Sequence, residues 1–155
     1  MPGMREQEIL SPPEILAVPR GVWGRIGCDP CAPQGGNHVK ARVTYDGSNA
    51  DGLKETWLNE CYANVPYGKL RLWMEKAAGE KTEEMMMLFP VRSHRVWWCY
   101  LLPDIADLIC WLRPVKIVGY KQAFPAPLVL TYRGVEAGPF REKCAGLGHV
   151  TENLF

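Results

Sequence analysis

The sequence has no apolar run long enough to cross a membrane. A membrane-spanning helix needs roughly 20 consecutive apolar residues, and the apolar runs of this chain are far shorter. Residues 1–6 also lack the apolar core of a secretion signal. We therefore expect no membrane partner and an intracellular location.

The sequence also lacks an excess of charge of either sign. Its 18 lysines and arginines nearly balance 17 aspartates and glutamates, so the net charge is +1. A polyanionic partner would therefore have to bind local basic patches. Internal repeats and low-complexity linkers are absent, and 155 residues are typical of one domain. We expect a single domain over residues 1–155, with a glycine-rich tail of unclear structure from about residue 134 to residue 155.

Metal-binding patterns are nearly absent as well. The six cysteines of a chain without a secretion signal are expected to be reduced. Cys28 and Cys31 have the spacing of a zinc knuckle, but no second pair follows, so His38, Cys61 or Cys144 would have to complete the site singly. Structural zinc is the alternative interpretation, and we expect no metal. A zinc deaminase fits less well still, because no histidine begins a His-x-Glu sequence.

The order of helix and strand patterns indicates an α/β fold. Residues 70–79 have apolar side chains at helical spacing, and residues 83–90 follow as an apolar run of buried-strand length. Together with the run that begins at Cys61, they form a strand, a helix and a strand with short connections, which requires parallel pairing by a crossover. Residues 107–112 and 128–132 are expected to finish as an antiparallel pair. We therefore expect one open, mostly parallel sheet with a reversed edge strand.

The apolar run from Cys61 ends abruptly in Asn64, Val65, Pro66 and Tyr67. If the run is a parallel strand, these residues lie just past its carboxyl end, where open α/β sheets bind ligands. The side-chain oxygen of Asn64 and the carbonyl of Val65 can accept hydrogen bonds from an exocyclic amine, and Pro66 stiffens the turn. Tyr67 offers a flat face for a nucleobase. These four residues are the predicted catalytic group.

Two earlier loops suit a bound nucleotide. Residues 24–28 lead into a loop of small residues, 29–36, which lets a ligand approach the backbone closely. Residues 39–45 alternate apolar and polar side chains and then meet a turn-rich segment that contains Asp46 and Asp51. A carboxylate after a second strand can bind a ribose hydroxyl pair. The alternative is that these Asp-Gly pairs only make turns.

Residues 64–67 resemble the Asn/Asp-Pro-Pro-Tyr/Phe motif of amino-group DNA methyltransferases, and the whole chain is similar to the small phage-type DNA N-6-adenine methyltransferases. Further motifs carry the resemblance, in the order of the family, from about residue 11 to residue 132. They are Ser-Pro at 11–12, Asp-Pro-Cys at 29–31, Asp-Gly-Leu at 51–53 before Trp57, Arg92 before Trp97 and Trp98, and Phe-Pro at 124–125. The chain departs from the family at Val65, where the family has its first proline.

The resemblance implies a Rossmann-like methyltransferase sheet that binds S-adenosylmethionine across its carboxyl edge. In this family the Ser-Pro segment borders the methionine end of the cofactor, the Asp-Pro-Cys loop holds its amino acid moiety, and the two aspartates contact the nucleoside. The cofactor-binding residues implied are Ser11, Pro12, Asp29, Pro30, Cys31, Ala32, Asp46 and Asp51. Independently of the resemblance, residues 11–16 have the form of a helix start with a serine cap.

Basic residues near the Asn64 turn and in later loops predict contacts with DNA phosphates. They are Lys69, Arg71, Arg92, Arg95 and Lys121. Because no separate recognition domain is visible, we expect double-stranded DNA to be bound with loose sequence preference and strong salt dependence.

These features together predict a DNA adenine methyltransferase that moves a methyl group from S-adenosylmethionine to the exocyclic amine of adenine. The target base would leave the stack, and positioning and electrostatics would supply the catalysis. The resemblance implies a role in DNA methylation in the cytoplasm of a phage-infected or prophage-bearing bacterium. Because Val65 removes some rigidity from the turn, the alternative is a catalytically weakened homologue that binds DNA or cofactor as a phage factor.

Overall fold

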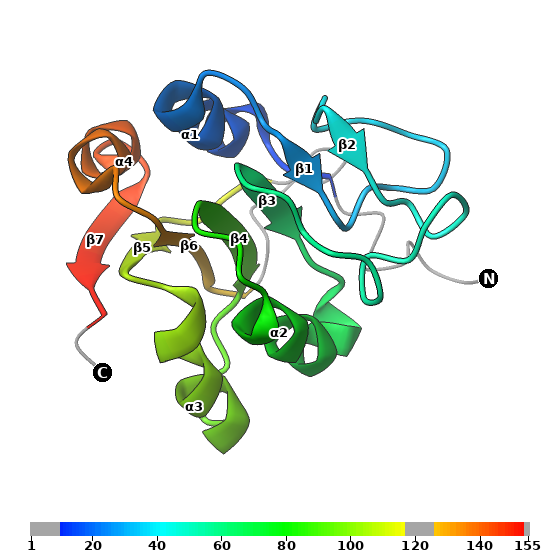
Figure 1. Ribbon diagram of the computed structural model, residues 1–155. Helices are drawn as coiled ribbons and strands as arrows, with labels where there is room; N and C mark the ends of the chain where they lie inside the picture. Colours follow the sequence, from blue (N-terminus) through cyan, green and yellow to red (C-terminus); the bar gives the residue numbers. More distant parts are fainter. Residues whose placement is uncertain (1–9, 117–125, 154–155) are drawn as a thin grey trace.

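The computed structural model describes residues 10–116 and 126–153, which form one seven-stranded sheet with helices on both faces (Figure 1). The strands are β1 (Cys28–Asp29), β2 (Val43–Thr44), β3 (Cys61–Asn64), β4 (Met85–Pro90), β5 (Leu108–Leu112), β6 (Leu128–Arg133) and β7 (Gly148–Glu152). The helices are α1 (Pro13–Trp23), α2 (Leu70–Gly79), α3 (Val96–Ile105), α4 (Ala137–Cys144) and the 3-10 helix η2 (Tyr67–Lys69). None of the helices in these two ranges is long and apolar enough to cross a membrane.

The strand order is β2-β1-β3-β4-β6-β5-β7. The predicted open α/β sheet, the parallel β3–β4 pair and the antiparallel β5–β6 pair are confirmed. The sheet is mixed, however, and not mostly parallel, because three of its six pairings are parallel and three are antiparallel. One reversed strand, β6, lies inside the sheet between β4 and β5, and the reversed edge strand is β7. The segment after residue 134 adds this edge strand, and its pairing with β5 is antiparallel, as are the β4–β6 and β6–β5 pairings.

The sheet buries both of its faces. On β4, Met85, Met87 and Phe89 pack against the layer of α2 and α3, whereas Met86 and Leu88 face the layer of α1 and α4. All five side chains are fully buried. A strand covered on both sides has no polar face, which explains the continuous apolar run and confirms that the methionines are core.

The start of α1 differs from the prediction. The N-cap is Pro12 and not Ser11, and no side chain caps the helix. The hydroxyl of Ser11 instead lies within hydrogen-bonding distance of the hydroxyl of Tyr62, at 2.8 Å. Two further strands were predicted within residues 24–28 and 39–45. The observed strands there, β1 and β2, have only two residues each.

The C-terminal segment, for which the sequence indicated no structure, forms α4 and β7. Phe140 of α4 is fully buried and stacks on Tyr132 of β6, with 4.9 Å between ring centroids. The Tyr132 hydroxyl donates to Glu84, which also accepts the indole N–H of Trp23 at 3.0 Å. The only local signal for α4 is the spacing of Phe140 and Cys144, four residues apart on one helix face.

We expect Phe140→Ala to lower the free energy of unfolding by about 3 to 5 kcal/mol, because it leaves a cavity where a buried ring stacks on the sheet. Urea denaturation measures this change. Val135→Ala is the matched control, since this side chain is 86% exposed, and it should change stability by less than about 0.5 kcal/mol. Equal effects of the two substitutions would show that α4 does not pack on the sheet.

Candidate functional site

Predicted site residues lie at the carboxyl ends of all four parallel strands. Asp29 ends β1, Asn64 ends β3, Asp46 follows β2 by two residues, and Arg92 follows β4 by two residues. The chain goes from β1 to β2 on one side and then to β3 on the other side of β1. Ligands of open α/β sheets bind where the strand order reverses in this way. The β1–β3 junction is therefore the expected ligand site.

A cleft of about 400 Å³ opens beyond β1 and β2, a size typical of small-molecule sites. Its lining includes five of the eight predicted cofactor residues and one predicted catalytic residue, namely Pro30, Cys31, Ala32, Asp46, Asp51 and Pro66. Two aromatic residues that the sequence did not single out for this role, Tyr45 and Trp73, also line the cleft. The helical spacing of residues 70–79 predicts Trp73 as a core residue, and its burial agrees with that.

Backbone contacts hold the walls of the cleft together. The amide of Ala32 donates to the Tyr45 carbonyl at 3.1 Å, which ties the small-residue loop to the end of β2. Gly52 lies so close to the Pro30 carbonyl that a Cβ atom there would overlap it. The buried Trp57 donates from its indole nitrogen to the Gly52 carbonyl at 2.7 Å. Glycine is therefore required at position 52 to bring the two loops together.

The two cleft aspartates organise their own turns. Asp46 accepts hydrogen bonds from the amides of Asn49 and Ser48, the hydroxyl of Ser48 and the amide of Gly35. These bonds, that of the Asn49 amide first, hold the pKa of Asp46 well below its usual range. Asp51 likewise accepts the amide of Leu53 at 2.9 Å. Both residues make turns, as the alternative interpretation expected, and both also line the cleft.

Asp29 is a carboxyl group that the fold buries at the site. Its side chain is 2% exposed, and Oδ1 accepts the Cys31 amide at 3.0 Å. Within the described ranges, Oδ2 is buried without a hydrogen-bond partner. Burial raises the pKa of Asp29 to about 7, against the opposing effect of the Cys31 amide. An unsatisfied buried carboxylate oxygen is expected to have a ligand or a water as its partner.

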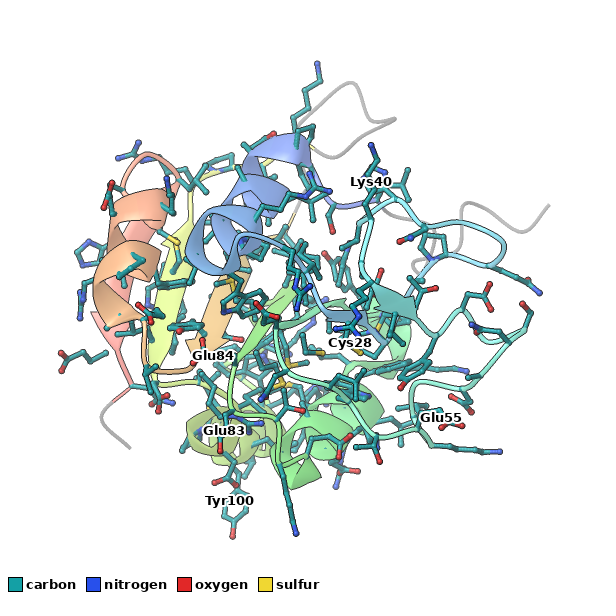
Figure 2. All side chains as sticks on the ribbon, turned by 45° about the horizontal axis from the view of Figure 1, so that its top comes forward. Cys28, Lys40, Glu55, Glu83, Glu84 and Tyr100 are labelled. Atoms are coloured by element: carbon teal, nitrogen blue, oxygen red, sulfur yellow. The ribbon has the colours of Figure 1, made fainter. Side chains whose placement is uncertain are left out.

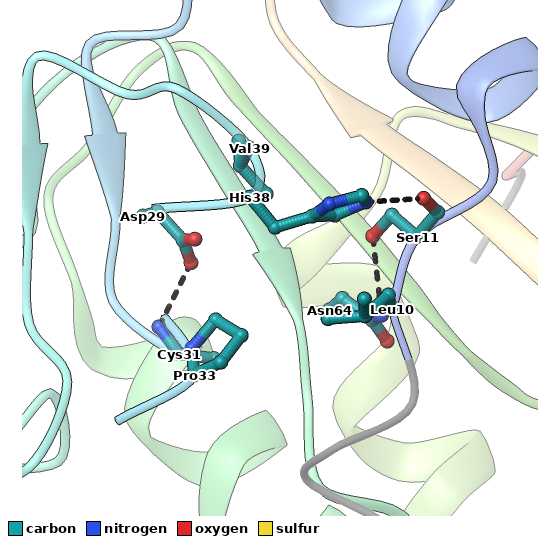
Figure 3. Close-up of a pocket in the computed structure, with 8 residues that line it drawn as sticks. All are labelled: Leu10, Ser11, Asp29, Cys31, Pro33, His38, Val39 and Asn64. Atoms are coloured by element: carbon teal, nitrogen blue, oxygen red, sulfur yellow. Dashed lines mark hydrogen bonds between the residues drawn. The ribbon is translucent and has the colours of Figure 1, made fainter. Parts of the chain in front are cut away.

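A small cavity of about 10 Å³, enough for about one water, lies between Asp29 and Asn64. Cys31 and Pro33 line both this cavity and the large cleft, so the two spaces adjoin. Figure 3 shows Asp29 on one side of the cavity, Asn64 on the other, and His38 extending toward Ser11. The structure thus brings together residues from β1, β3 and the start of α1.

Asn64 is held by a hydrogen bond that the sequence did not predict. Its amide nitrogen Nδ2 donates to Ser11 Oγ at 3.1 Å, and Ser11 Oγ also lies 2.8 Å from the Tyr62 hydroxyl (Figure 3 draws the first of these). Ser11 is nearly fully buried. The Ser11 carbonyl accepts a hydrogen bond from Nε2 of His38 at 2.8 Å. Ser11 therefore contacts the predicted catalytic asparagine directly.

The rest of the predicted catalytic group turns from the strand into η2. Val65 is buried in the apolar layer of α2 and α3, and Pro66 follows with φ −63°. Tyr67 is only 7% exposed. The exposed part of Tyr67 lines the neighbouring pocket.

That neighbouring pocket, about 300 Å³ in volume, is basic. It gathers four of the five predicted phosphate-binding residues: Lys69, Arg71, Arg92 and Arg95. His94 and Trp97 line it as well, and none of its described lining residues is acidic. Arg71 is paired with Glu75 at 2.9 Å. The fifth predicted residue, Lys121, and the Phe-Pro loop lie outside the described residues.

No three side chains of histidine, cysteine, aspartate or glutamate gather into a possible metal site within residues 10–116 and 126–153. Both cysteines of the zinc-like pair pack in or against the apolar cluster of α2 and α3 (Figure 2 labels Cys28). Cys28 is fully buried opposite Cys61 of β3, whereas Cys31 lines the cleft.

Comparisons of the chain with protein-family models, with curated proteins and with solved structures found no match. The functional assignment therefore depends on the residues and on their arrangement.

The raised pKa of Asp29 predicts a specific pH dependence of stability. The folded protein holds this proton more tightly than the unfolded chain, so the contribution of Asp29 to stability is largest below about pH 4 and is lost as the pH rises through about 7. In Asp29→Asn this decrease, of up to about 4 kcal/mol, should be absent. Urea denaturation of both proteins between pH 4 and pH 8 measures the difference. Parallel pH profiles would contradict the raised pKa.

Proposed function

We propose that the chain binds S-adenosylmethionine in the cleft beyond β1 and β2 and transfers its methyl group to the amine of adenine in DNA. One observation carries the proposal: residues assigned to the cofactor, to the amine and to DNA line adjoining spaces on one sheet edge. The cleft and the small cavity share Cys31 and Pro33. Pro66 lines the cleft, and the next residue, Tyr67, lines the basic pocket.

The cleft and the small cavity that adjoins it together have the groups that such a cofactor needs. The unsatisfied oxygen of Asp29, which lines the small cavity, suits the ammonium group of an amino acid. Tyr45 and Trp73 offer ring surfaces, and the indole N–H of Trp73 is buried without a hydrogen-bond partner in the described part of the chain. When bound, S-adenosylmethionine supplies a methyl group on a positively charged sulfur.

The residues of the β3 turn would act on the target amine. Oδ1 of Asn64 and the carbonyl of Val65 accept hydrogen bonds from its two N–H groups, which directs the nitrogen lone pair toward the donor. Tyr67 contacts the base from the side of the basic pocket. The amine nitrogen forms its bond to the methyl carbon as the carbon–sulfur bond breaks, and the neutral thioether is the leaving group. The surplus proton on nitrogen passes to water after the transfer, so the reaction does not require a general base beside the amine.

The basic pocket supports DNA as the second substrate. Four cationic residues line this pocket together with Tyr67, and a pocket of that charge favours phosphate. Because phosphates carry no sequence information, contacts of this kind position the duplex without selecting a long site.

A second function, cofactor or DNA binding without methyl transfer, is favoured by Val65. A valine leaves the backbone of the turn less restricted than the proline of the resembling family would. If this function is correct, the wild type binds S-adenosylmethionine without transferring its methyl group, and Val65→Pro gains transfer.

We expect Asn64→Ala to abolish the transfer of labelled methyl groups to unmodified DNA, because the substitution removes an interaction made with the amine in the transition state. Affinity for S-adenosylmethionine, measured by calorimetry, should stay within about two-fold. Nuclease digestion of the product identifies the methylated base.

The cleft itself is tested by ligand-dependent melting. A ligand that binds only the folded chain raises the melting temperature as its concentration exceeds Kd. Absence of a shift with millimolar S-adenosylmethionine or its demethylated product would reject the cofactor assignment.

We expect Arg92→Gln and Arg95→Gln each to weaken DNA binding, because each removes a cation that neutralises phosphate. The slope of log affinity against log salt should become shallower by about 0.9 for every phosphate that is no longer neutralised. Fluorescence anisotropy with a labelled duplex at several salt concentrations measures this slope. Arg141→Gln on α4 is the matched control, since Arg141 pairs with Glu152 at 3.3 Å away from the pocket. An equal weakening in the control would mean that net charge, and not the pocket, binds DNA.

A further inference from the structure

A buried chain of hydrogen bonds leads from the core to Asn64. The hydroxyl of Tyr62 lies 2.8 Å from Ser11 Oγ, and Ser11 Oγ accepts the Asn64 amide at 3.1 Å. Tyr62 and Asn64 are two residues apart on β3, so their side chains lie on the same face of the sheet. The start of α1 brings Ser11 to that face.

Two members of this chain, Tyr62 and Ser11, are constrained by burial. Tyr62 is fully buried, and desolvation raises the pKa of its hydroxyl, which keeps it protonated. A buried hydroxyl without a partner destabilises the fold, and Ser11 is the partner that the described structure gives Tyr62. The Ser11 hydroxyl is therefore held by the core on one side and by Asn64 on the other.

The backbone of Ser11 is fixed independently of its side chain. Its carbonyl accepts Nε2 of His38 at 2.8 Å. The next residue, Pro12, caps α1, and its carbonyl accepts the amides of Ile15 and Leu16, both at 3.1 Å. Ser11 thus presents its hydroxyl to Asn64 from a rigid position.

We propose that Ser11 and Tyr62 are positioning residues that fix the rotation of the Asn64 amide. With Nδ2 bonded to Ser11, Oδ1 is turned away from Ser11, as Figure 3 shows. This inference rests on the proposed function in one respect, that Oδ1 is the atom that accepts the substrate amine. It gives Ser11 a different role from the contact with the cofactor's methionine end that the resemblance implies.

The side-chain amide signals of Asn64 test the positioning without any activity measurement. In ¹⁵N-labelled protein, Ser11→Ala should shift both Nδ2 proton resonances of Asn64 and speed their exchange with water, and Tyr62→Phe should shift them less. Tyr132→Phe is the control, because it also removes a fully buried hydroxyl, but one bonded to Glu84. Asn64 signals that stay in place in both Ser11→Ala and Tyr62→Phe would overturn the proposal.

Kinetics separate positioning from cofactor binding. Ser11→Ala and Tyr62→Phe should lower kcat for methyl transfer between about two-fold and ten-fold, the effect of removing one neutral hydrogen bond. Kd for S-adenosylmethionine should remain within about two-fold, and Ser11→Thr should recover part of the decrease in kcat. A weakened Kd with unchanged kcat would overturn the proposal and place Ser11 in the cofactor site. If the wild type transfers no methyl group, only the proposed function is contradicted. The amide signals of Asn64 then test whether Ser11 and Tyr62 position its side chain.

Discussion

The pairing of Cys28 on β1 with Cys61 on β3 is the contact on which the candidate site depends. It is parallel, so the ends of both strands meet at one edge, and it lies where the strand order reverses. Asp29 and Asn64 follow within three residues of this pair. Because β1 has only two residues, its position is maintained by its neighbours, including the amide of Val43, which donates to the Gly27 carbonyl at 3.0 Å. A change in this pairing would move the two sides of the small cavity apart.

Burying polar groups at this edge of the sheet lowers the stability of the fold unless they are hydrogen-bonded. Some of these groups have such partners and one does not. The chain from Tyr62 through Ser11 to Asn64 satisfies its members by hydrogen bonds. Asp29 is only half satisfied, since Oδ2 has no partner among the described residues. Buried groups without partners are rare in native proteins and concentrate where ligands bind. The two arrangements therefore differ: the hydroxyls of Tyr62 and Ser11 are bonded to each other and Ser11 to Asn64, whereas one oxygen of Asp29 is buried without a partner in the described part of the chain.

Much of the central sheet and most of the candidate residues could be predicted from sequence, because their signals are local. The apolar run of β4, the helical spacing of α2 and the abrupt end of β3 at Asn64 are set by neighbours along the chain. The residues of α4 carry only a weak signal of this kind, the spacing of Phe140 and Cys144, which are its two buried residues. The contacts of Ser11 were also missed. Its proline neighbours suggest a helix cap, whereas its hydroxyl bonds residues more than fifty positions away.

Short stretches of sequence were enough to specify the alternating elements, the buried methionine strand and the small set of polar residues at strand ends. Hydrophobic periodicity and turn chemistry act over a few residues, so the order of residues along the chain contains them. The choice of neighbouring strands, the insertion of β6 between β4 and β5, and the pocket that Lys69, Arg71, Arg92 and Arg95 share with Tyr67 became visible only in the folded chain. Those outcomes depend on contacts between distant segments. Such contacts form because the whole sheet must bury both faces at once, and no single segment encodes that requirement.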